Sequence, residues 1–198
     1  MMKSIAIFCG SALGTDPIFA ETAQIVGQQL AENRITLVYG GGRSGLMGIV
    51  ADSALQAGGQ VIGVIPKQLV DRELAHPNLT ELYVVENMHE RKTKMSELSD
   101  GFVAIPGGAG TLEEIFEQWT WAQLGIHLKP CAFLNVEGFY DDLLKFIHFT
   151  AEKGFTQSRF SQSLICSASF SEILIQLQSY TAPQPKWGMA ADQQDLVK

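Results

Sequence analysis

The chain of 198 residues has little of what disulfide frameworks and metal sites are built from. It contains three cysteines, Cys9, Cys131 and Cys166, an odd number without a CxxC pair. This spacing excludes a disulfide framework and a zinc knuckle, so the cysteines are expected to be buried thiols. The four histidines form no HExxH motif, because His89 is followed by Glu90-Arg91-Lys92-Thr93. We therefore expect no metal site.

Positive charge and long apolar runs are also scarce. Lys plus Arg number 14 against 21 Asp plus Glu, which gives a net charge of -7. This sign is wrong for neutralising a phosphate backbone, so nucleic acid is not an expected partner. The apolar runs at residues 4–9 and 101–105 are far shorter than the roughly 20 residues of a membrane helix, so no membrane partner is expected. The first residues lack the long apolar region and cleavage site of a signal peptide, and the expected compartment is the cytoplasm.

The chain does have the composition of a globular domain. Hydrophobic residues make up 46% and charged residues 18%, which excludes wholesale disorder. The length is that of one domain, since domains run to about 100–200 residues. We expect one nucleotide-binding α/β domain over residues 1–181, followed by a loosely ordered tail at 182–198, where Pro183 and Pro185 occur without any periodicity.

Apolar runs rich in β-branched residues alternate with segments of helical periodicity. Strands are expected at residues 4–9, 36–39, 60–65, 81–85, 102–105 and 131–135. Asp16-Pro17 supplies an N-cap and a favoured first residue for a helix that runs to about residue 33. Further helices are expected at 45–57, 87–98, 111–124, 140–153 and 170–180. Strands that are apolar throughout and separated by helices are typical of a sheet buried on both faces. The predicted fold is a Rossmann-like, doubly wound parallel sheet with helices on both faces.

Three of the expected strand-to-helix junctions are rich in glycine. They read Cys9-Gly10-Ser11-Ala12-Leu13-Gly14, Tyr39-Gly40-Gly41-Gly42-Arg43-Ser44-Gly45-Leu46-Met47-Gly48, and Pro106-Gly107-Gly108-Ala109-Gly110-Thr111-Leu112-Glu113-Glu114. Open parallel sheets bind ligands beyond the carboxyl ends of their strands, and glycine lets backbone N–H groups approach a phosphate. One such loop is equally well explained by tight turns and close packing. Three at one sheet edge favour a phosphate-bearing ligand.

The second junction fits neither common nucleotide motif. Gly40-x-Gly42-x-x-Gly45 has the spacing of a dinucleotide fingerprint, but Ile65-Pro66-Lys67 stands where the ribose-binding acid is expected. Leu46 stands where a Walker loop needs its lysine. We therefore expect neither NAD binding nor ATP hydrolysis.

Two further segments place charged residues near these loops. Met88, Arg91, Lys92 and Met95 recur at i, i+3, i+4 and i+7, so one helix face is both apolar and cationic. Either basic side chains cover methionines on a surface helix, or a nucleotide places its base against the methionines and its phosphate against the cations. Thr111-Leu112-Glu113-Glu114 fits a capping box. Acidic side chains beside an anion-binding loop nevertheless repel the anion, so their presence there favours a functional role.

These segments resemble the LOG ("lonely guy") family of cytokinin-activating phosphoribohydrolases, long labelled lysine decarboxylases. The resemblance covers about residues 4–150 and rests on Cys9-Gly10-Ser11, Tyr39-Gly40-Gly41-Gly42, Gly45-Leu46-Met47-Gly48, Met88-His89-x-Arg91-Lys92-x-x-Met95, Pro106-Gly107-Gly108-x-Gly110-Thr111-Leu112-Glu113-Glu114 and Trp119-Thr120-Trp121-Ala122-Gln123-Leu124-Gly125. It implies a homodimer, without a cofactor, that hydrolyses the N-glycosidic bond of a nucleoside 5′-monophosphate. The implied products are the free base, a cytokinin or adenine, and ribose 5-phosphate.

The resemblance also implies roles for individual residues. Arg91 and Glu114 match the catalytic pair. Together with the helix face described above, it makes the following residues candidate substrate contacts: Glu73, Met88, Lys92, Gly107, Gly108, Ala109, Gly110, Thr111, Leu112, Glu113 and Thr120. Candidates for further phosphate or ribose contacts are Gly10, Ser11, Gly41 and Gly42.

The expected chemistry suits these residue types. Cleavage of the C1′–N bond develops positive charge on the ribose, which a carboxylate such as Glu114 can stabilise while it activates water. Pyridoxal phosphate chemistry is not expected, because none of the nine lysines stands in a Schiff-base setting. A non-catalytic nucleotide-binding or carrier module of the same fold is the alternative function. Whether the base is N6-isopentenyladenine, adenine or another is left open.

Overall fold

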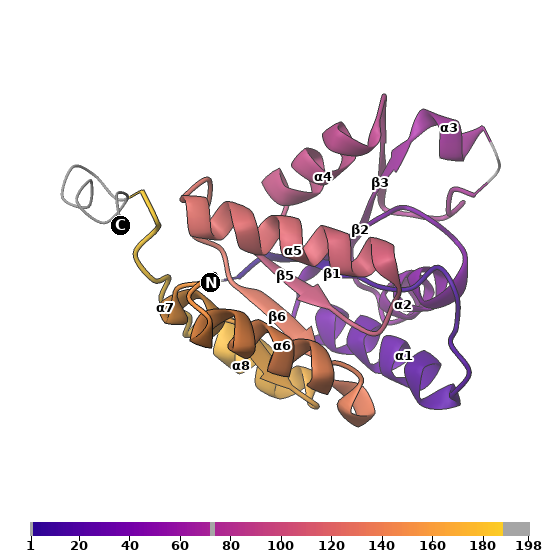
Figure 1. Ribbon diagram of the computed structural model, residues 1–198. Coiled ribbons are helices and arrows are strands. Elements are labelled where there is room, and N and C mark those ends of the chain that lie inside the picture. Colours follow the sequence, from indigo (N-terminus) through magenta and orange to yellow (C-terminus); the bar gives the residue numbers. More distant parts are fainter. Residues whose placement is uncertain (1, 72–73, 188–198) are drawn as a thin grey trace.

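A single parallel sheet of seven strands forms the centre of the protein (Figure 1). The computed structural model describes residues 2–71 and 74–187. The strands lie in the order β4-β3-β2-β1-β5-β6-β7. Their bounds are β1 Ser4–Phe8, β2 Thr36–Tyr39, β3 Val61–Pro66, β4 Glu81–Val85, β5 Gly101–Ala104, β6 Cys131–Leu134 and β7 Ile165–Ser167. The predicted doubly wound α/β fold is confirmed.

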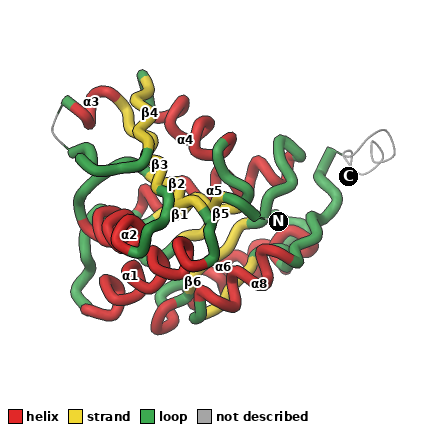
Figure 2. Tube along the Cα trace, turned by 180° about the vertical axis from the view of Figure 1, so that it is seen from behind, coloured by secondary structure: helices red, strands yellow, loops and turns green. Residues whose placement is uncertain are grey.

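Helices cover both faces of this sheet (Figures 1 and 2). One layer contains α1 Pro17–Glu32, α2 Gly45–Gln56 and α8 Phe170–Gln178, and the other contains α4 Met88–Glu97, α5 Ala109–Leu124 and α6 Asp141–Glu152. Strand β1 shows the alternation that this requires, since Ile5 and Ile7 pack into the first layer and Ala6 and Phe8 into the second. Three short elements complete the described chain: α3 Lys67–Val70, η1 Val136–Gly138 and α7 Ser158–Ser161.

The expected elements lie within two residues of the observed ones, and the differences have local causes. Strand β7 has only three residues, too few for a periodic pattern to reveal. The prediction that the strands are buried on both faces is wrong for β4, because β4 is an edge strand and leaves Leu82 and Val84 exposed. The prediction of buried thiols holds for Cys9 and Cys131 and is wrong for Cys166, which is exposed on β7.

The order of the strands creates a crevice between β1 and β5. From β1 the chain adds β2, β3 and β4 on one side, whereas β5, β6 and β7 lie on the other. The connections after β1 and β5 therefore lead away from each other at the carboxyl edge. In doubly wound sheets, this reversal is where ligands bind.

All three glycine-rich junctions meet at this crevice. The backbone N–H of Gly10 donates to the carbonyl of Pro106 at 3.1 Å, and the N–H of Leu46 donates to the carbonyl of Gly10 at 3.1 Å. Gly45 has a φ of +60°, and a Cβ there would collide with the backbone of Ser11. Glycine is therefore needed for the first two junctions to touch.

The end of the described chain packs against α5. The backbone N–H of Lys186 donates to the carbonyl of Gln123 at 2.8 Å, and its ammonium lies 5.8 Å from the ring centre of Phe160. Residues 188–198 of the expected tail lie outside the described residues. Within residues 2–71 and 74–187, no helix combines the length and apolar character needed to cross a membrane.

A half-buried histidine, His127, follows the end of α5. Its Nδ1 accepts a hydrogen bond from the backbone N–H of Lys129 at 3.2 Å, so the proton of the neutral ring is on Nε2, which lies 3.3 Å from Oε1 of Gln118. The ring also packs against Phe102. Burial, and then the charge of Lys129, lowers the pKa of His127 from 6.5 to about 4.

This histidine should make the stability of the fold depend on pH. The unfolded chain binds the proton near pH 6.5 and the folded chain only near pH 4. Stability is therefore fully present above pH 6.5 and falls as the pH drops through this window. In His127→Gln, the melting temperature should fall less between pH 7 and pH 4.5 than in the unaltered protein. His148→Gln, at an exposed position of α6, is the control, and equal pH slopes in all three proteins would contradict the assignment.

Candidate active site

Helix α4 begins at a capping arrangement that the sequence supplies locally. Oδ1 of Asn87 accepts a hydrogen bond from the N–H of Glu90 at 2.9 Å, and the Glu90 carboxylate accepts one from the N–H of Glu86 at 3.1 Å. This start turns Arg91 and Lys92 inward, where they are 8% and 7% exposed. The cationic helix face expected from the spacing is thus confirmed as a buried one.

The two methionines of that face differ. Met95 is 1% exposed and belongs to the core between α4 and the sheet. The hypothesis that a base packs against both methionines is therefore wrong for Met95. Met88 is 44% exposed, and its sulfur lies 4.0 Å from Nη1 of Arg91. Of the two, Met88 alone is accessible to a substrate.

Helix α5 begins earlier than expected, and this changes the meaning of its acidic residues. Its N-cap is Gly108, which offers no side chain to the first amides. Thr111 lies inside the helix and is buried, so the capping box predicted for Thr111 and Glu114 is wrong. Gly108, Ala109 and Gly110 are exposed. A helix N-terminus with exposed, uncapped amides is suited to an anion.

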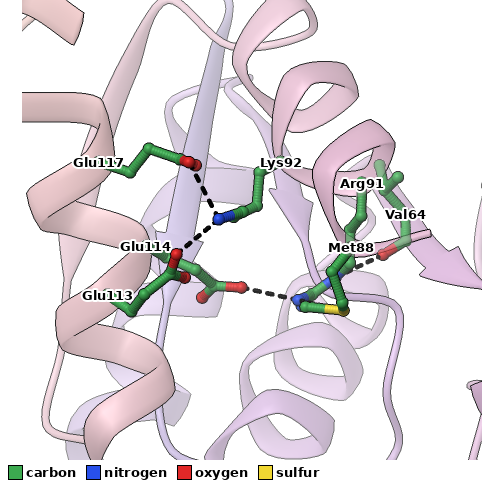
Figure 3. Close-up of polar contacts among 7 residues, drawn as sticks. All are labelled: Val64, Met88, Arg91, Lys92, Glu113, Glu114 and Glu117. Carbon is green, nitrogen blue, oxygen red and sulfur yellow. Dashed lines mark hydrogen bonds and ion pairs between the residues drawn. The ribbon is translucent and has the colours of Figure 1, made fainter.

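Arg91 and Glu114 form a buried ion pair between α4 and α5 (Figure 3). Nη1 of Arg91 lies 2.8 Å from Oε1 of Glu114, and its Nε donates to the carbonyl of Val64 at 3.1 Å. A Cβ at Gly40 would collide with the guanidinium, so the second glycine-rich junction makes room for Arg91. The predicted catalytic pair is thus in direct contact, although α4 and α5 are separate in the chain.

The environment of Glu114 alters its acidity. Burial raises the pKa of this carboxyl, while the charge and hydrogen bond of Arg91 act against the rise. A carboxylate with a raised pKa is a stronger base than an exposed one. The pair can therefore hold a negative charge in place and accept a proton.

Lys92 lies between two further carboxylates of α5. Its Nζ is 2.5 Å from Oε1 of Glu113 and 3.0 Å from Oε1 of Glu117. Burial alone would lower the pKa of Lys92, but the hydrogen bonds and charges of the two glutamates outweigh it and raise the pKa. Lys92 therefore stays charged. Glu117 was absent from the sequence-based site, although its spacing of four residues from Glu113 puts both on one helix face.

An apolar cavity of about 330 Å³ adjoins the glycine-rich junctions. Its volume falls within the usual range of ligand pockets, about 300–1,000 Å³. Gly10, Ser11, Gly107 and Gly108 of the first and third junctions line it. Leu13, Phe19 and Phe139 also line it, and the rings of Phe19 and Phe139 meet edge to face at 5.7 Å. No motif pointed to the two phenylalanines, which come from α1 and the segment after β6.

The other candidate residues differ in their exposure to solvent. Gly41 and Gly42 are buried, and they pair with residues 74–76 through the N–H of His76 on the carbonyl of Gly41 at 2.9 Å. Thr120 is exposed on α5, and Leu112 is half-buried. Glu73 lies outside the described residues. Within the described ranges, no three His, Cys, Asp or Glu side chains gather as they would around a metal ion.

Comparison with known proteins decides the family. The family described as "Possible lysine decarboxylase" matches residues 47–177. Cytokinin riboside 5′-monophosphate phosphoribohydrolase LOG7 of Arabidopsis thaliana is 45% identical over 90% of this chain and 82% of its own length. The corresponding LOG enzyme of Oryza sativa subsp. japonica is 43% identical over 97% of this chain and 79% of its own length. The chain belongs to the LOG family.

A solved structure shares this fold. The Moco carrier protein from Chlamydomonas reinhardtii superposes with a TM-score of 0.68 over 90% of this chain and 99% of its own. Its sequence is 21% identical. At that identity, the likeness shows the fold alone.

The buried pair leads to a prediction for Glu114→Gln. The amide can still accept a hydrogen bond from Arg91, but a buried guanidinium loses its counter-charge. The free energy of unfolding should therefore fall by about 2 kcal/mol, whereas a capping role would leave it unchanged. Chemical denaturation measures this difference. Glu97→Gln, at an exposed position of α4, is the control, and equal stability of the two variants would contradict a structural role for the pair.

Proposed function

We propose that this LOG-family chain hydrolyses the N-glycosidic bond of adenosine 5′-monophosphate or its N6-modified, cytokinin-type derivatives. Water adds its hydroxyl to C1′, the base leaves with a proton, and ribose 5-phosphate is formed. The observation that carries the proposal is the buried Arg91–Glu114 pair beside the uncapped start of α5. The activity for which the LOG7 and LOG relatives are named supports the same reaction.

Glu114 is the proposed catalytic base. As the C1′–N bond lengthens, the ribose gains oxocarbenium character, and a buried carboxylate stabilises that charge more strongly than water would. The same carboxylate can orient the attacking water and take its proton, which its raised pKa favours. Arg91 holds Glu114 in one orientation and presents a cation to the ribose hydroxyls or phosphate.

The phosphate is the proposed anchor. The amides from Gly107 to Thr111 and the positive end of the α5 dipole are suited to it, and Lys92 adds a charge from α4. Binding energy from this unreactive group would position C1′ for attack. A nucleotide should therefore react faster than its nucleoside, in addition to binding more tightly.

Two other activities have less support. A pyridoxal phosphate enzyme needs a lysine whose amine is readily deprotonated, but the pKa of Lys92 is raised by two carboxylates. Burial does lower the pKa of Lys129, yet this residue precedes β6 at the amino edge of the sheet, away from the glycine-rich junctions. A carrier module is suggested by fold likeness at 21% identity, against 43–45% for the phosphoribohydrolases. Turnover of AMP separates a carrier from a hydrolase.

A homodimer, which the family resemblance implies, completes the proposal. Trp119 of α5 is not available for an interface, because its own chain buries it and its Nε1 donates to the carbonyl of Phe160 at 3.2 Å. Leu124, Ile126 and Leu128 are exposed at the end of α5. Adjacent exposed apolar side chains are typical of association surfaces.

The phosphate anchor predicts a strong preference for nucleotides. Adenine release from AMP should exceed release from adenosine in both kcat and kcat/KM. Adenosine lacks the phosphate, so no binding energy from that group is available to position C1′. Liquid chromatography of released adenine measures both rates. Equal kcat/KM for the two compounds would exclude the anchor, and binding of AMP without any adenine release would favour the carrier module.

Association is tested by mass. Light scattering at micromolar concentration should give about twice the 21.6 kDa of one chain. Ile126→Asp should shift the mass toward one chain if the exposed residues at the end of α5 form the interface. A monomeric mass of the unaltered protein would overturn the proposed dimer.

A further inference from the structure

The charges around Lys92 present a difficulty for an anionic substrate. Arg91 and Lys92 supply two positive charges, and Glu113, Glu114 and Glu117 supply three negative ones. The cluster therefore carries a formal net charge of -1. Each cation also has a carboxylate partner already. A phosphate that approaches these residues meets no unpaired cation among them. Lys92 or Arg91 can give its full charge to the phosphate only if one of the ion pairs opens.

The three carboxylates are not equally easy to release. The side chain of Glu113 is 55% exposed, that of Glu117 is 22% exposed and that of Glu114 is 11% exposed. A carboxylate that leaves its partner must be hydrated, which costs least where water already surrounds it. Glu113 is therefore the one that can turn into solvent, while Glu114 and Glu117 have little room to do so.

Glu117 contacts Lys92 from the same helix as Glu113, one turn farther along α5 (Figure 3). Its Oε1 lies 3.0 Å from Nζ of Lys92, and its Oε2 is buried without a hydrogen-bond partner. A buried, unpaired carboxylate oxygen is costly, and the contact with Lys92 is what offsets this cost. Glu117 and Lys92 therefore depend on each other whether or not Glu113 is present.

We propose that Glu113 is a replaceable counter-ion, which occupies Lys92 in the empty protein and is displaced from it by the phosphate of the substrate. Glu117 is a positioning residue that keeps the Lys92 ammonium in the site during the exchange. The inference rests on the proposed function, since it needs a phosphate ester as ligand. It assigns Glu113 a role opposite to the direct nucleotide contact that the family resemblance implies.

The two glutamates give opposite predictions for the same chemical change. Glu113→Gln and Glu117→Gln each remove one of the two negative charges that pair with Lys92. General electrostatics would make both variants bind a phosphate dianion more tightly. Under the proposal, Glu113→Gln tightens binding because Lys92 no longer has to be released. Glu117→Gln weakens it, because Lys92 loses the carboxylate that holds it.

Binding of ribose 5-phosphate by calorimetry tests this directly. The compound carries the phosphate but has no glycosidic bond, so turnover does not interfere. The dissociation constant should fall about three- to tenfold in Glu113→Gln and rise at least threefold in Glu117→Gln. Glu97→Gln is the matched control, because Glu97 is an exposed glutamate that also pairs with a lysine, Lys94, at 3.6 Å. Its dissociation constant should stay within about 1.5-fold, since salt screens distant charges.

A second ligand separates an effect on phosphate from a general one. Ribose lacks the phosphate, so Glu113→Gln should leave its binding unchanged. In AMP hydrolysis, Glu113→Gln should lower KM more than it changes kcat, whereas Glu117→Gln should raise KM. Melting curves confirm that each variant is folded. If Glu117→Gln is not folded, unchanged or weaker binding of ribose 5-phosphate by Glu113→Gln still overturns the proposal.

Each outcome has a definite meaning. Weaker ribose 5-phosphate binding by Glu113→Gln would make Glu113 a substrate contact and overturn the proposal. Tighter binding by both site variants, or an equal gain in affinity in Glu97→Gln, would be explained by the change in net charge alone. Either result would also overturn the proposal. If neither ribose 5-phosphate nor AMP binds the unaltered protein, the proposed function itself fails, and that result is distinct from the others.

Discussion

The close approach of three backbone segments at the switch point is the constraint on which the site depends. Gly10 links them, since its N–H donates to Pro106 after β5 and its carbonyl accepts from Leu46 at the start of α2. Such contacts need glycine, because a Cβ at Gly45 or Gly107 would collide with the neighbouring junction or the next helical turn. They fix where α2 and α5 begin and leave the first amides of α5 open at the crevice. If a loop lay farther from the others, the proposed phosphate anchor and the backbone packing next to it would both be lost.

The site also depends on the burial of charged side chains, which the close approach of the glycine-rich junctions makes possible. The glycine-rich junction after β2 makes room for the guanidinium of Arg91, and α5 places Glu114 against it at 2.8 Å. A buried ion pair is weak as a source of stability, because the desolvation of both charges offsets much of their attraction. Its retention is better explained by chemistry. A carboxylate with a raised pKa and a fixed orientation is what the cleavage of a glycosidic bond requires.

Much of this arrangement is predictable from the sequence, and the failures share a physical cause. Periodicity and glycine-rich junctions predict the fold, the sheet edge and the cationic face of α4, because these features repeat along the chain. The start of α5 was misjudged because the Thr111 capping signal is local, whereas packing buries Thr111 and leaves Gly108 as the N-cap. Phe19 and Phe139 reach the cavity through tertiary packing alone. Glu117 has a clear helical spacing from Glu113, but only its contact with Lys92 shows that it belongs to the site.

If Glu113 is a replaceable counter-ion, as proposed, the excess of carboxylates makes the site selective for phosphate esters. If Arg91 and Lys92 were unpaired, the crevice would attract any small anion, and the two cations would repel each other in a partly dry environment. Pairing Lys92 with glutamates keeps it charged, as its raised pKa indicates. An anion must then offer more than charge to displace an existing partner. A phosphate has several acceptor oxygens and can reach the α5 amides and Lys92 together, whereas a single carboxylate has two. Competition within the protein thus becomes a source of specificity, because it penalises weak ligands more than a well-matched one.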